Sequence, residues 1–119
     1  MLNQKYKHQF DLEDRTAAFS NIILSFCRTI TINYLTENQI RQLIKSATSI
    51  GANYMEANGS DSKRDFRSKI CICKKEAKET TYWLKILFNL FPNKSDELKK
   101  LWAEAQELLL IFSAILKNT

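Results

Sequence analysis

The side chains that could carry out acid–base or covalent chemistry are few in this chain. His8 is the single histidine, and no Ser/His/Asp or Cys/His pair can be proposed near it in the sequence. It lies in a polar segment without apolar periodicity, which is typical of an exposed side chain. We therefore expect no catalytic residues and no enzymatic activity.

The cysteines and carboxylates do not form a metal-binding pattern either. Cys71 and Cys73 are two residues apart, so on a helix they point about 160° away from each other and cannot hold one metal ion together. Glu76 and Glu79 lack the histidines of the Glu-x-x-His pairs that build a di-metal bundle. No glycine-rich phosphate loop or zinc spacing is present. We expect no metal and no cofactor.

Basic residues carry the clearest chemical signal. The net charge is +5, and residues 41–85 contain ten bases against five acids, whereas the rest of the chain is balanced. The whole excess therefore lies in the middle of the sequence. A concentrated positive charge indicates an anionic partner.

Five bases of this region share one side of a helix that we predict over residues 62–90. At 100° per residue they fall within about 60° of arc and form a row about 33 Å long with no acid in it. We call this row the basic stripe: Lys63, Arg67, Lys74, Lys78 and Lys85. It predicts contacts to the phosphates of a nucleic acid, RNA in our interpretation. An acidic protein surface or a plainly solvated face would carry similar residues.

A second side of the same predicted helix mixes apolar and acidic residues. We call it the mixed face: Ile72, Glu76, Glu79, Trp83 and Ile86. Its apolar members either complete the core of the same chain or contact a second copy of it. In the second case the two glutamates pair with bases of the neighbouring subunit.

Four helices must position these residues. Apolar spacings of three and four predict helices over about 12–32, 37–58, 62–90 and 96–117. Thr36 and Gln39 have the spacing of a capping box, Gly59 and Pro92 mark helix ends, and Ser62 is among the residues that cap the third helix. Gly51, in the small-residue centre of the second helix, indicates close packing against another helix.

These elements predict one all-α domain. The chain has two glycines and one proline, too few for an all-β fold with its many turns. We expect a flexible N-terminal arm over residues 1–10 and an antiparallel up-down-up-down four-helix bundle over residues 11–119. No apolar run approaches the roughly 20 residues of a membrane span. The odd cysteine count and the absence of a secretory signal favour the cytoplasm.

Several segments in this order resemble a bacterial family. They are residues 11–16, 46–57, 62–70, 75–80 and 82–84. The family consists of four-helix bundle proteins encoded in intervening sequences of 23S ribosomal RNA genes, sometimes labelled S23 ribosomal protein. The resemblance covers about residues 10–90, and the fourth helix only in character.

This resemblance implies a ring-like homopentamer and no known catalytic activity. The family is also similar to the accessory protein of diversity-generating retroelements, a basic bundle that binds nucleic acid and a reverse transcriptase. The leading hypothesis is thus a homo-oligomeric RNA-binding bundle. The alternative is an interaction scaffold, or accessory factor, for a protein such as a reverse transcriptase. Neither hypothesis involves a membrane.

Overall fold

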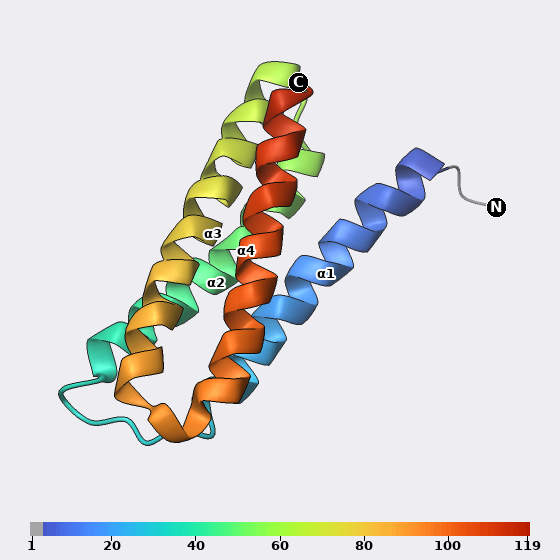
Figure 1. The fold of residues 1–119 in the computed structure, drawn as a ribbon. Helices are drawn as coiled ribbons and strands as arrows, with labels where there is room; N and C mark the ends of the chain where they lie inside the picture. The colour runs from blue at the N-terminus through green and yellow to red at the C-terminus, as the bar shows by residue number, and fades with distance from the viewer. Residues whose placement is uncertain (1–3) are drawn as a thin grey trace.

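The computed structural model describes residues 4–119, with side chains from Leu12 onward, and the regular elements of this range are all helical. The order is α1 (Gln4–Cys27), α2 (Glu37–Asn58), α3 (Lys63–Leu90), a short 3₁₀ turn η1 (Pro92–Lys94) and α4 (Ser95–Lys117). Short connections make consecutive helices antiparallel (Figure 1). The predicted all-α four-helix architecture is confirmed.

The first helix differs from its predicted bounds at both ends. It begins at Gln4, because residues 4–10 contain no glycine or proline and include good helix formers. The helix thus starts about eight residues earlier than predicted, and residues 1–3 lie outside the described part of the chain. The flexibility of the arm over residues 1–10 stays a prediction. The helix ends at Cys27, just before the β-branched run of residues 29–32, whose side chains are restricted in a helix.

Local side-chain chemistry sets some of the other helix ends. Ser62 accepts a hydrogen bond from the Asp65 amide at 3.0 Å and caps α3 as predicted. The predicted capping box at α2 does not form: the Thr36 hydroxyl instead accepts from the Asn33 amide at 3.1 Å, within the preceding turn. Gly59 ends α2 at a φ of −92°, without using the left-handed region.

Helices α1 and α2 meet at Gly51, where the sequence predicted close packing. A Cβ atom at this position would lie 3.1 Å from the Thr16 hydroxyl oxygen and 3.2 Å from its Cβ. Thr16 is buried and donates to the Leu12 carbonyl at 2.9 Å, so it is held in place. A larger residue at position 51 would require Thr16 to shift by a few tenths of an ångström, so glycine favours this close approach.

The core is built from all four helices. Side chains such as Phe19, Leu43, Leu87 and Phe112 are almost fully buried. The α3 helix packs against both α2 and α4, whereas α1 is inclined and its N-terminal part diverges from α4 (Figure 1).

An ion pair nevertheless joins α1 to α4. Arg15 lies 2.7 Å from Glu104 and 3.0 Å from Glu107. The hydrogen bond to Glu104 raises the pKa of Arg15, so the guanidinium stays charged. This contact places Glu104 and Glu107 on the side of α4 that faces α1.

Candidate nucleic-acid interface

The five residues of the basic stripe are exposed along α3, on the side that borders α4. At one end, Arg67 contacts the last turn of α4. At the other end, Lys85 lines a pocket together with Lys99 and Trp102 of α4. The opposite side of α3 borders α2, where Lys69 pairs with Glu56 at 2.8 Å.

The four lysines of the stripe, Lys63 included, have no acidic partner within the part of the chain whose side chains are described. Lys74, Lys78 and Lys85 form no ion pair there, in contrast to Lys69 on the other side of the same helix. Unpaired surface cations keep their field directed toward solvent. The lysines of the stripe are therefore free to meet an external anion.

Arg67 has a structural contact that the sequence analysis did not anticipate. Its Nη1 donates to the Leu116 carbonyl at 2.8 Å and to the Thr119 hydroxyl at 2.9 Å. The last carbonyls of a helix have no partner within the helix, and the negative end of the dipole favours a cation there. Arg67 thus adds charge to the stripe and also ties α3 to the end of α4.

The neighbouring surface of α4 continues the acid-free character of the stripe. Six residues at spacings of three and four lie on this side of α4: Lys99, Trp102, Gln106, Leu110, Ser113 and Lys117. Trp102 is 43 % exposed and Leu110 is 66 % exposed. The sequence predicted α4 from its apolar spacing alone, and that spacing does not show that this row lies beside the stripe.

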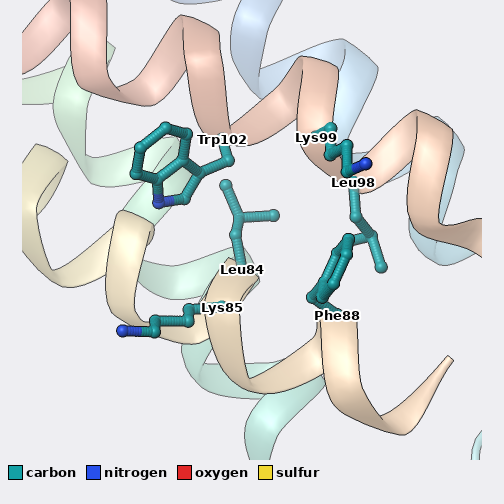
Figure 2. A pocket seen from close by; sticks show the side chains of 6 residues that line it. All are labelled: Leu84, Lys85, Phe88, Leu98, Lys99 and Trp102. Carbon is teal, nitrogen blue, oxygen red and sulfur yellow. The ribbon is translucent and has the colours of Figure 1, made fainter. Parts of the chain in front are cut away.

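A pocket of about 240 Å³ opens where the two helices carry Lys85 and Lys99. Leu84 and Leu98 line it with almost fully buried side chains. Figure 2 shows Trp102 of α4 on one side of Leu84 and Phe88 of α3 on the other. The Lys99 ammonium lies 5.9 Å from the centre of the Phe88 ring, so the pocket is aromatic and apolar inside and cationic at its rim.

The mixed face is placed on the side of α3 nearer to α2, and its members divide between the two predicted roles. Trp83 is half-buried against the core, and its indole N–H donates to Glu79 at 3.3 Å. Ile72 remains 37 % exposed, and Tyr82, whose ring packs against that of Trp83, is 55 % exposed. Burial raises the pKa of the Glu76 carboxyl, and the charge of Glu79 acts in the same direction.

The cysteines lie as their spacing predicted. Cys71 is exposed and Cys73 is buried, as is Cys27. Burial raises the pKa of Cys73 to about 12 and that of Cys27 to about 11, which keeps both thiols protonated and unreactive. Among the residues whose side chains are described, no group of histidine, cysteine and acidic residues is arranged to hold a metal ion. His8 lies outside those residues.

Within the described range, none of the helices is both apolar enough and long enough to span a bilayer. The fold and its charged surface define a helical bundle with an acid-free cationic seam between α3 and α4.

Comparison with known proteins gives the family. The chain belongs to the 23S rRNA-intervening sequence protein family, which it matches over residues 14–114. It is also similar to a solved structure from Bacteroides thetaiotaomicron VPI-5482, a protein with unknown function from the S23 ribosomal protein family. The two are 30% identical with a TM-score of 0.79, over 88% of this chain and 97% of the other. The comparison with curated proteins gave no match.

This result confirms the family resemblance that the sequence indicated. The further likeness to the retroelement accessory protein stays a prediction.

Proposed function

We propose that the protein is a non-enzymatic, homo-oligomeric RNA-binding bundle of the bacterial cytoplasm, which contacts the phosphate backbone through the basic stripe. The observation that carries this proposal is the row of exposed lysines without acidic partners, Lys74, Lys78 and Lys85, among the side chains described. Lysines that serve only to keep a helix soluble are commonly paired with acids one turn away. A row of unpaired cations can follow the phosphates of a nucleic acid strand.

The surroundings of the stripe support the same partner. The adjoining row on α4 adds Lys99 and Lys117 and no acid. The name of the family refers to 23S rRNA, which makes RNA the first nucleic acid to test. Contacts to phosphates alone do not select a sequence, so we expect binding that depends on charge and shape.

The test compares two variants with the same change in net charge. Lys74→Glu/Lys78→Glu alters the stripe, whereas Lys45→Glu/Lys100→Glu alters exposed lysines of α2 and α4 outside it. Near 0.1 M salt each phosphate contact contributes about 0.7–0.9 decades of affinity. The stripe variant should therefore lose about 25- to 60-fold or more for structured RNA, and the control variant much less.

The salt dependence provides the second criterion. The slope of log affinity against log salt should fall by about 1.4–1.8 in the stripe variant, because two contacts are lost. Wild-type affinity that does not change with salt would contradict the proposal. A parallel titration with duplex DNA shows whether RNA is preferred.

Cys71 offers a test that needs no substitution. It is the exposed cysteine of the three, and at 100° per residue it lies about 40° from Arg67, beside the stripe. Bound RNA should slow its reaction with a thiol reagent, while the buried Cys27 and Cys73 stay unreactive with or without RNA. Unchanged labelling of Cys71 at saturating RNA would place the nucleic acid elsewhere.

We further propose that copies of the chain meet through the mixed face, where Ile72 is exposed and where the exposed Tyr82 packs against Trp83. Light scattering at micromolar concentration should give a multiple of the 13.9-kDa chain mass, five copies if the family resemblance holds. Ile72→Lys should lower that mass, and Leu110→Lys, an equally apolar change on the far side of the bundle, should not. A monomer mass for the wild type would refute this part.

The same exposed residues, Ile72 and Tyr82, also fit the alternative function, a scaffold for a protein such as a reverse transcriptase. A defined complex with such a protein that survives nuclease treatment, and that Ile72→Lys disrupts, would favour this alternative over RNA binding.

A further inference from the structure

We propose that the pocket between α3 and α4 is a stacking site for one unpaired RNA base, with the flanking phosphates on Lys85 and Lys99. This inference rests on the proposed function, because the bound strand is the one that follows the basic stripe. It adds a class of ligand that the stripe alone does not specify: single-stranded RNA, or a loop or bulge with a base turned outward.

The shape and lining of the pocket fit a flat aromatic ring. Leu84 and Leu98 form an apolar floor, and Trp102 and Phe88 supply aromatic surface from two different helices (Figure 2). Trp102 is 43 % exposed although it is the largest apolar side chain of α4. Every base has a π-face, so an accessible indole binds bases with little regard to sequence.

The charge around the pocket favours a nucleotide over an apolar partner. Lys85 and Lys99 are exposed at the rim, and no acidic side chain lines the pocket. Neither lysine forms an ion pair with the side chains described. An apolar peptide helix would cover these ammonium groups without offering them an anion, whereas a nucleotide provides a ring and a phosphate together.

The size and position of the pocket limit the ligand further. Its volume, about 240 Å³, is below the roughly 300–1,000 Å³ of sites for drug-sized ligands, so it suits one base rather than a dinucleotide cofactor. It lies at the Lys85 end of the basic stripe, and Lys78 follows about 10 Å along the helix. A strand anchored by one base can therefore continue over the stripe.

The experiment measures the affinity of three labelled RNA probes by fluorescence anisotropy at one salt concentration. The probes are an oligouridine, an abasic oligomer of the same length and a blunt duplex. Trp102→Ala should weaken oligouridine binding about 5- to 150-fold, the range that loss of one stacked base implies. It should leave the abasic oligomer and the duplex unchanged, since neither presents an unpaired base.

Matched variants keep the result interpretable. Trp102→Phe should retain most of the affinity, because it keeps an aromatic ring at the site. Tyr34→Ala removes an exposed aromatic residue of the connection between α1 and α2, outside the pocket, and should not distinguish the probes. If Trp102→Ala unfolds at a lower urea concentration than the wild type, Trp102→Leu replaces it in the same comparison, because leucine keeps an apolar side chain at this site.

Failure of this inference differs from failure of the proposed function. The stacking site is wrong if Trp102→Ala loses affinity equally for all three probes, or if it loses none for oligouridine. If Lys74→Glu/Lys78→Glu loses duplex binding while Trp102→Ala binds oligouridine normally, only the stacking site is wrong. If the wild-type protein binds none of the probes, both proposals are wrong.

Discussion

The α3 helix contacts two neighbours, and the two seams differ in how they treat polar groups. Toward α2, the Thr80 hydroxyl lies 2.9 Å from that of Ser46, and Lys69 pairs with Glu56 at 2.8 Å. Toward α4, the lysines of the basic stripe have no acidic partner among the side chains described, and an apolar pocket stays open. One seam satisfies its polar groups internally and the other leaves them for a partner.

One helix can therefore contribute to stability on the side that faces α2 and to binding on the side that faces α4. Polar groups that are paired inside the molecule hold the helices in register and contribute little field outside. Unpaired cations contribute little to folding but keep an external potential. Substitutions on the α2 side should therefore change the free energy of unfolding, and those on the α4 side should change affinity for RNA.

The largest expected effect is on the α2 side of α3. Leu87 is fully buried, so Leu87→Ala should lower the free energy of unfolding by about 2–5 kcal/mol through lost burial and a residual cavity. Lys74→Ala, on the exposed side, should change it by no more than about 0.5 kcal/mol. Urea unfolding followed by circular dichroism measures both values, and similar costs would remove the distinction between the sides.

The hydroxyl pair of the α2 seam should have a smaller effect. Thr80→Val removes the contacts of the Thr80 hydroxyl with Ser46 and with the Glu76 carbonyl at nearly constant shape, and it should cost about 1 kcal/mol. Thr81→Val is the matched control, because the Thr81 hydroxyl bonds to the Lys78 carbonyl of its own helix. A double-mutant cycle with Ser46→Ala isolates the pair, and zero coupling would show that the two hydroxyls do not act together.

Arg67 is the residue of the stripe that forms hydrogen bonds across the α3–α4 seam, among the side chains described. Arg67→Ala should cost only about 0.5 kcal/mol, because its hydrogen bonds to Leu116 and Thr119 are exposed. Hydrogen exchange should increase in the last turn of α4, and the salt slope of RNA binding should fall by about 0.7–0.9. A lower slope without faster exchange would mean that Arg67 serves binding alone.

The smallest expected effect is the pH response of Glu76. Burial first, and then Glu79, raise the pKa of this carboxyl, while Lys75 and Lys45 oppose the shift. With a raised native pKa the folded state keeps the proton longer than the unfolded chain, so stability falls as pH rises above about 4.5.

Glu76→Gln should therefore raise the free energy of unfolding at pH 7 by a few tenths of a kcal/mol. It should also flatten the pH dependence of stability in mildly acidic solution, which a series of urea midpoints measures. A variant that is less stable at pH 7 would show that the charged carboxylate has a favourable partner.

The residues of α2, α3 and α4 show how far local patterns reach. The bounds predicted for these helices lie within one residue of Glu37–Asn58, Lys63–Leu90 and Ser95–Lys117, because apolar periodicity and strong stop signals agree there. At the start of α1 the sequence signals for the helix boundary were weaker. The acidic residues after Asp11 looked like a helix start, although nothing in the preceding residues prevents a helix.

The basic stripe could be predicted as a row because five bases on one helix share a side whatever that helix packs against. Its setting could not be predicted. Lys85 and Lys99 are far apart in the chain, as are Arg67 and Leu116, and each pair comes together only because α4 packs along that side of α3.

Four helices and the concentration of positive charge on α3 could be inferred from the amino-acid sequence, since these follow from interactions within about four residues and from composition. The family could be inferred from the resemblance of several segments in order. Three features could be seen only in the tertiary structure. The stripe borders α4, Arg67 donates to a carbonyl in the last turn of that helix, and Trp102 lines the same pocket as Lys85. The physical reason is that the choice of neighbours depends on the sum of many core contacts between residues distant in the chain. No local pattern contains that sum.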